Sequence, residues 1–181
     1  CIAMRIVSGK YKRRIITPPK NLPVRPTTDM AKESLFNILN NYIDFSGQNV
    51  LDLFSGTGNI SYEFISRGAA LVTSVDKDFG CIKFIKETAA KLSMDNLKPV
   101  RQDVFRFLNN TKSKYDIIFA DPPYKLESIG ELADTIIERG LLKESGWLII
   151  EHPKEIDFSN NKYFHEHRNY GSVNFSLFIF K

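Results

Sequence analysis

The residues with the clearest chemical potential form the tetrad Asp121-Pro122-Pro123-Tyr124, which follows an apolar run. This combination suits an amino group attached to an aromatic base, whose nitrogen is a poor nucleophile because its lone pair is shared with the ring. The Asp121 carboxylate and the Pro122 carbonyl can accept the two amino hydrogens and favour the loss of that conjugation. The prolines fix φ and add no N–H donor, and Tyr124 offers a face on which a base can stack. The tetrad therefore predicts attack of a base amino group on a methyl carbon.

The second informative segment is the glycine-containing loop Phe54–Asn59, which follows the apolar run Val50–Phe54. Gly56 and Gly58 allow backbone to approach a ligand closely, and the following helix start adds unpaired N–H groups. Asp52, just before the loop, suits a cofactor with a positive amino group, which S-adenosylmethionine carries. A nicotinamide cofactor is the alternative, but its Gly-x-Gly-x-x-Gly pattern is broken here by Ser61.

Four aspartates fall at or just beyond the carboxyl ends of predicted strands: Asp52, Asp76, Asp103 and Asp121. In an open α/β sheet, ligands bind at that edge. Asp76 could accept both ribose hydroxyls, and Asp103, with the Val104 N–H nearby, could reach an adenine amino group. Any one of these acids is better explained as a turn or cap residue. Four aspartates along the same edge of the predicted sheet, however, predict a cofactor site.

The elements that must position these residues alternate between strand and helix along the chain. A helix is expected behind the capping residues Thr27–Asp29, to about Ile43, and a hairpin is expected at the end, turning at Gly171. The alternation predicts an α/β fold: a Rossmann-like, mostly parallel seven-stranded sheet with helices on both faces and a C-terminal antiparallel hairpin. Strands are expected at 50–54, 71–75, 99–102, 117–120, 147–151, 163–170 and 172–180, and the intervening helices at 60–67, 82–92, 104–108 and 129–139.

Charge is unevenly distributed over the 181 residues, whose net charge is +4. Residues 1–25 hold seven cations and no acid, so residues 26–181 hold 18 cations and 21 acids. A basic segment on a mildly acidic body indicates a polyanion partner or a solvated tail. We therefore expect a basic N-terminal arm over residues 1–28 and a catalytic domain over residues 29–181.

Several classes of protein are disfavoured by what the chain contains. The two cysteines, Cys1 and Cys81, lack ligand spacing, so neither a metal site nor a disulfide framework is expected. Cys81 beside Ile82 suits a small buried hydrophobe, which argues against cytosine-C5 chemistry that needs a thiolate. No segment suits a membrane span or a secretory signal, so we expect a cytoplasmic monomer.

At these residues the chain resembles the class I S-adenosylmethionine-dependent methyltransferases, and from about residue 4 to 181 it resembles the RsmD-type bacterial 16S rRNA guanine-N2 methyltransferases. The segments that carry the closer resemblance are Arg5–Gly9, Arg25–Asp29 and Glu33–Asn37, together with the loop and the tetrad. The resemblance implies methyl transfer to the N2 amino group of a guanine in small-subunit ribosomal RNA, and a segment around Thr27–Asp29 that closes over cofactor and base.

The expected site residues follow from the motifs and the resemblance together. The catalytic residues are Asp121, Pro122, Pro123 and Tyr124. The residues expected to bind S-adenosylmethionine, or its product S-adenosylhomocysteine, are Thr27, Asp52, Phe54, Ser55, Gly56, Thr57, Gly58, Asn59, Asp76, Lys77, Asp103, Val104 and Asp121. The residues expected to bind RNA are Lys10, Lys12, Arg13, Arg14, Arg25 and Asp29.

Two other functions fit parts of the sequence. An adenine-N6 DNA methyltransferase can share the Asp-Pro-Pro-Tyr tetrad, although such enzymes usually have extra target-reading surface that this chain lacks. A non-catalytic RNA-binding module could retain the same fold.

Overall fold

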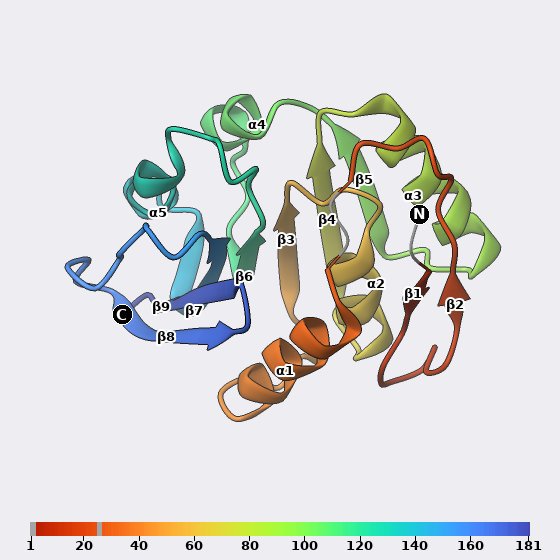
Figure 1. Ribbon diagram of the computed structural model, residues 1–181, viewed down its shortest axis with the longest axis horizontal. Helices are drawn as coiled ribbons and strands as arrows, with labels where there is room; N and C mark the ends of the chain where they lie inside the picture. Colours follow the sequence, from red (N-terminus) through yellow and green to blue (C-terminus); the bar gives the residue numbers. More distant parts are fainter. Residues whose placement is uncertain (1–2, 25–26) are drawn as a thin grey trace.

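The computed structural model describes residues 3–24 and 27–181 and has a seven-stranded sheet at its centre (Figure 1). The strand order is β5-β4-β3-β6-β7-β9-β8. The strands from β5 to β7 are mutually parallel, and β9 is antiparallel to both β7 and β8. The predicted α/β fold with a C-terminal antiparallel hairpin is therefore confirmed. The strands are β3 Asn49–Leu53, β4 Leu71–Asp76, β5 Leu97–Arg101, β6 Tyr115–Ala120, β7 Leu142–His152, β8 Phe164–Tyr170 and β9 Val173–Ile179.

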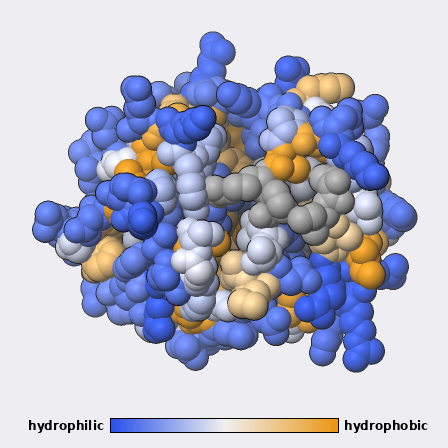
Figure 2. Space-filling view, in the orientation of Figure 1, coloured by the Kyte–Doolittle hydropathy of each residue, from blue (hydrophilic) through white to orange (hydrophobic). Residues whose placement is uncertain are grey.

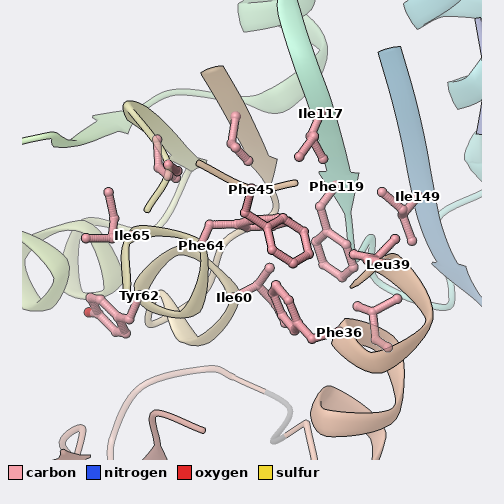
Figure 3. Close-up of a cluster of buried hydrophobic side chains, with 14 of the residues drawn as sticks. Phe36, Leu39, Phe45, Ile60, Tyr62, Phe64, Ile65, Ile117, Phe119 and Ile149 are labelled. Carbon is pink, nitrogen blue, oxygen red and sulfur yellow. The ribbon is translucent and has the colours of Figure 1, made fainter. Parts of the chain in front are cut away.

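In the described part of the chain, five helices cover the two faces of the sheet. They are α1 Asp29–Asn40, α2 Asn59–Ser66, α3 Phe79–Lys91, α4 Val104–Asn110 and α5 Ile129–Glu138. Buried residues of α1, α2 and α3 share one core cluster with Phe119 and Ile149 of the sheet, and Figure 3 shows part of this cluster. Buried residues of α4 and α5 share the other cluster with Ala120 and Ile150. Successive strand residues thus face opposite layers, as the alternation of a strand requires.

Several element boundaries differ from the sequence-based expectation, and three of them are described here. Helix α1 ends at Asn40 rather than Ile43, because the Asn41 N–H caps the carbonyls of Ile38 and Leu39. Strand β5 begins two residues earlier than expected. Strand β7 begins at Leu142 rather than Trp147, and its pairing with β6 shifts across an irregularity at which Ser145 has φ 64°. Such a bulge interrupts the alternating pattern by which strands are predicted.

The N-terminal segment packs against the rest of the molecule instead of projecting from it. Its two short strands, β1 Met4–Arg5 and β2 Ile15–Ile16, pair antiparallel, and Met4, Ile6 and Ile16 are buried in the core. The turn between them binds the end of α2. The Lys10 N–H donates to the Ser66 carbonyl at 2.8 Å, and the Tyr11 N–H donates to the Ser66 hydroxyl at 2.9 Å.

A buried charge network ties this segment to helices α1 and α2. Glu63 of α2 is fully buried and accepts hydrogen bonds from the backbone N–H groups of Val7 (2.9 Å) and Ser8 (3.1 Å). Its carboxylate also pairs with Lys32 at 3.0 Å and Arg67 at 2.8 Å. The Lys32 ammonium donates in addition to the Arg5 carbonyl and to the Asn59 side chain at 2.8 Å. Because these charges are paired and hydrogen-bonded, their burial is tolerated.

We expect Gly9 to be a strong constraint on this attachment. It has φ 88°, and a Cβ there would lie 1.9 Å from the Ser66 carbonyl oxygen. Gly47, with φ 78° and nothing within 4 Å of its would-be Cβ, is a matched control. Gly47→Ala should lower the free energy of unfolding by about 1–2 kcal/mol through backbone strain alone. Gly9→Ala should lower it by about 2 kcal/mol more, because the new Cβ also clashes with Ser66. Urea unfolding of both variants tests this; equal losses would contradict the close approach.

None of the described helices is both long and apolar enough to cross a membrane.

Candidate active site

A cavity of about 880 Å³ lies at the edge where the parallel strands end. Because β3, β4, β5 and β6 are parallel neighbours, their carboxyl ends meet there. The predicted residues that line it are Thr27, Asp52, Phe54, Ser55, Gly56, Thr57, Asn59, Asp76, Lys77, Asp103, Val104, Asp121, Pro122, Pro123 and Tyr124. The glycine loop and the acidic tetrad therefore share one cavity.

Asp52 is a strongly perturbed acid of the cavity. It is almost fully buried inside β3 and accepts a hydrogen bond from the Ser61 hydroxyl at 2.6 Å, while Ser61 also contacts the Ser74 hydroxyl. Burial is the main cause that raises the pKa of Asp52 to about 7; the hydrogen bond from Ser61 opposes this shift, and the nearby charges of Asp121 and Asp76 add to it. Ser61, which stands where the dinucleotide-binding pattern has its third glycine, therefore holds the Asp52 carboxylate in place.

Asp76 and Asp103 shape the cavity wall through backbone hydrogen bonds. The Asp76 carboxylate accepts from the Gly56 N–H and the Asp78 N–H, both at 2.9 Å. The Asp103 carboxylate caps helix α4 by accepting from the Arg106 N–H at 3.1 Å. Each carboxylate retains further lone pairs that can accept hydroxyl or amino hydrogens of a ligand.

The loop between β3 and α2 has the features of a ligand cradle. Phe54 has φ 57°, an unusual conformation for a bulky residue that concentrates at functional sites. Among the described residues, the buried Ser55 hydroxyl has no hydrogen-bond partner, and it lines the cavity. Gly58 does not line it: a Cβ there would meet the Tyr62 ring at 2.7 Å, so this glycine makes room for packing.

The tetrad leaves β6 as a rigid turn. The Asp121 N–H donates to the Leu53 carbonyl of β3 at 3.3 Å, and the Leu126 N–H donates to the Pro123 carbonyl at 2.9 Å. The first bond holds the turn against β3, the strand that carries Asp52, and the second closes the turn on itself. Asp121 and Tyr124 are both half-buried, so each presents part of its side chain to the cavity.

Sequence reasoning missed the part of the wall that the N-terminal segment forms. Leu22 and Val24 approach two glycines closely: a Cβ on Gly80 would lie 2.6 Å from Leu22, and one on Gly56 would lie 3.3 Å from Val24. The four prolines of residues 18–26 signalled an irregular segment, but nothing in them indicated this location. The missed lining residues are Ala3, Met4, Pro18, Lys20, Leu22, Pro23, Val24, Ile60, Asp78, Phe105, Phe119, Lys125 and Leu126.

Those residues expected to bind RNA that the structure describes lie outside the cavity. Lys10, Lys12, Arg13 and Arg14 form the β1–β2 turn at the Ser66 end of α2, on a molecule whose surface in Figure 2 is mostly hydrophilic. Helix α2 has eight residues and is about 12 Å long, which separates this turn from the loop before Asn59. Asp29 begins α1 and forms an exposed ion pair with Arg5 at 3.4 Å. Arg25 lies outside the described residues.

Comparison with known proteins places this arrangement in a family. Residues 4–179 match the family described as Conserved hypothetical protein 95. The ribosomal RNA small subunit methyltransferase D of Buchnera aphidicola subsp. Baizongia pistaciae (strain Bp) is 31% identical over 181 residues, which cover 98% of this chain and 92% of the relative.

Two solved structures share the fold. A candidate methyltransferase, yhhF, from Escherichia coli has a TM-score of 0.85 at 27% identity and covers 99% of this chain and 98% of its own. The T. thermophilus 16S rRNA N2 methyltransferase RsmC, solved with AdoMet and guanosine, has a TM-score of 0.79 at 16% identity and covers 99% of this chain and 50% of its own. Because the family match spans nearly the whole chain, the protein belongs to the Conserved hypothetical protein 95 family and is an RsmD-type methyltransferase.

Proposed function

We propose that the protein transfers a methyl group from S-adenosylmethionine to the N2 amino group of a guanine in small-subunit ribosomal RNA. The observation that carries this proposal is that the Asp121–Tyr124 tetrad lines the same cavity as Asp52, Asp76 and Asp103. The names of the relatives support it: the Buchnera relative is a ribosomal RNA small subunit methyltransferase, and RsmC is an N2 methyltransferase solved with guanosine.

The cavity suits S-adenosylmethionine on its own chemistry. Carboxylates of Asp52, Asp76, Asp78, Asp103 and Asp121 line it, which favours a cofactor with a sulfonium and an ammonium group. The buried Ser55 hydroxyl offers a polar contact. Phe54 and Phe105, with ring centroids 6.4 Å apart, offer an apolar wall for a purine. When bound, the cofactor supplies an activated methyl group.

The protein's own contribution would be to bind and orient the base amino group. The Asp121 carboxylate and the Pro122 carbonyl accept its hydrogens, which draws the nitrogen out of conjugation and provides a proton acceptor at the Asp121 oxygen. Tyr124 stacks on the base. Correct alignment of nucleophile and methyl carbon can contribute several kcal/mol of barrier lowering, on the order of 7 in favourable cases. The target base must leave its stack to enter, which is easiest in a loop.

We further propose that residues 1–28 contact RNA while residues 29–181 carry out transfer. The basic turn and the cavity lie at opposite ends of α2, so a bound RNA would run along this side of the molecule. Replacing Lys12, Arg13 and Arg14 with glutamine should weaken binding and reduce the slope of log affinity against log salt by about 2, since each lost phosphate contact removes about 0.7.

Filter binding of a small-subunit rRNA fragment between low and moderate salt measures this slope. A matched control replaces three exposed lysines of α3, Lys83, Lys86 and Lys91, with glutamine. If the control lowers the slope as much as the arm variant does, the effect is only one of net charge and the arm has no special role.

The proposed function is tested by methyl transfer from labelled S-adenosylmethionine to naked ribosomal RNA, small ribosomal subunits and duplex DNA. We expect label in RNA or in subunits and none in DNA. Transfer to DNA alone would support an adenine-N6 enzyme. RNA binding without any transfer would support a non-catalytic module.

A further inference from the structure

Glu151 of β7 is a buried carboxylate next to the tetrad that the chemistry above does not use. It is only 3% exposed. Strands β6 and β7 are parallel neighbours in which Ala120 pairs with Ile150. Asp121 and Glu151 are the next residues of the two chains, and adjacent strands lie about 4.8 Å apart. Glu151, still within β7, therefore lies at the level where Asp121 follows β6.

The alternation of the two strands places both carboxylates on one layer. Phe119 and Ile149 belong to the core cluster beneath α1 and α2, whereas Ala120 and Ile150 belong to the opposite cluster. The next residues, Asp121 and Glu151, return to the first layer. Phe175, which pairs with Glu151 across β7 and β9, belongs to that same cluster.

The hydrogen-bonding edge of guanine needs one more acceptor than the tetrad offers. That edge carries three donors, the two amino hydrogens at N2 and the N–H at N1, while Asp121 and the Pro122 carbonyl accept two. Resting on the function proposed above, we propose that Glu151 is the specificity-determining residue that accepts the N1 hydrogen. Adenine and 2-aminopurine have a lone pair at N1, which a carboxylate repels, so Glu151 selects guanine.

This contact has a structural requirement. Glu151 does not line the cavity, whereas Asp121 does. Side chains around the tetrad must therefore shift when a base enters, and the buried setting then strengthens a hydrogen bond to a charged acceptor. A wrong base loses one hydrogen bond to a charged acceptor, a loss on the order of 10- to 100-fold, and its N1 lone pair is repelled by the carboxylate.

The test compares a guanine substrate with its 2-aminopurine analogue, which keeps the amino group at C2 but has no N1 hydrogen. An rRNA fragment carrying the mapped target is made in both forms, and kcat/KM is measured for each. The wild-type protein should favour guanine at least 100-fold. Glu151→Gln, whose amide can donate to a lone pair, should lower this preference at least tenfold. The exposed Glu144→Gln, at the other end of β7, is the control and should leave it unchanged.

A second readout does not depend on turnover. With S-adenosylhomocysteine present, 2-aminopurine fluorescence reports entry of the base into the site, and Glu151→Gln should bind this fragment more tightly than the wild type does. Equal use of the two substrates by the wild-type protein, or an unchanged preference in a folded Glu151→Gln variant, would overturn the inference. Failure of the wild-type protein to methylate guanine RNA at all would overturn the proposed function instead. If Glu151→Gln does not fold, Glu151→Asp, which shortens the charged side chain, is compared instead, because 2-aminopurine also lacks O6 and the wild-type preference alone does not isolate the N1 contact.

Discussion

Asp121→Ala is expected to lower methyl transfer to RNA by about 10²–10⁴-fold, the usual contribution of a positioned proton acceptor. Asp121 leads the tetrad and lines the cavity, so its loss removes both an acceptor for the amino group and a destination for the proton. RNA affinity should change little, because the basic turn lies at the far end of α2. The measurement is single-turnover transfer of labelled methyl groups, with RNA binding measured in parallel.

The control for this variant is Asp116→Asn, at the other end of the same strand. Asp116 accepts from the Asn49 N–H at 2.8 Å and pairs with Lys143 at 3.3 Å, so it affects stability without touching the cavity. Its transfer rate per folded molecule should equal that of the wild-type protein. Full activity in Asp121→Ala would show that the Asp121 carboxylate takes no part in the reaction.

Asp52→Asn is expected to stabilise the cofactor-free protein and to weaken cofactor binding. A folded-state pKa of about 7, raised from 3.8 chiefly by burial, means that the folded protein binds the proton more tightly than the unfolded chain does. Stability from this group is therefore present below about pH 4 and is lost as the pH rises through about 7. At pH 8 the variant should be more stable by up to about 4 kcal/mol, at 1.36 kcal/mol per pKa unit.

The same carboxylate, once ionised, should attract the cationic cofactor. Affinity of the wild-type protein for S-adenosylhomocysteine, which retains the amino group, should therefore rise between pH 6 and pH 8. The variant should show no such rise. At pH 8 it should bind S-adenosylhomocysteine about tenfold more weakly than the wild-type protein, because it has lost one charge-assisted hydrogen bond. Urea unfolding and calorimetry across this pH range measure both effects. A less stable variant with unchanged cofactor affinity would contradict this role of Asp52.

The alternation of strands and helices, and the position of the acids at strand ends, could be predicted because both depend on local pattern. Val50–Leu53, apolar apart from Asp52, and the apolar run Ile117–Ala120 lie between turn signals, and each leads directly to an acid or a glycine loop. The start of β7 could not be predicted, because a bulge near Ser145 breaks the two-residue period.

The missed features depend on contacts between residues far apart in the sequence. Lys32 and Glu63 look like solvated charges on helices, yet both are buried because the N-terminal segment folds over them. Leu22 and Val24 look like loop residues, yet they pack closely against Gly80 and Gly56, whose lack of a side chain makes room for them. Ser61 looked like a defect in a dinucleotide pattern, whereas it donates a hydrogen bond to Asp52.

The central claim is that a guanine amino group meets a methyl donor at the cavity beside Asp121. The most direct test is nucleoside mass spectrometry of small-subunit RNA after reaction with the purified protein and S-adenosylmethionine, with Asp121→Ala as the comparison. We expect one additional N2-methylguanosine per RNA with the wild-type protein and none with the variant. A methyl group on any other atom, or equal yields from the two proteins, would contradict the account.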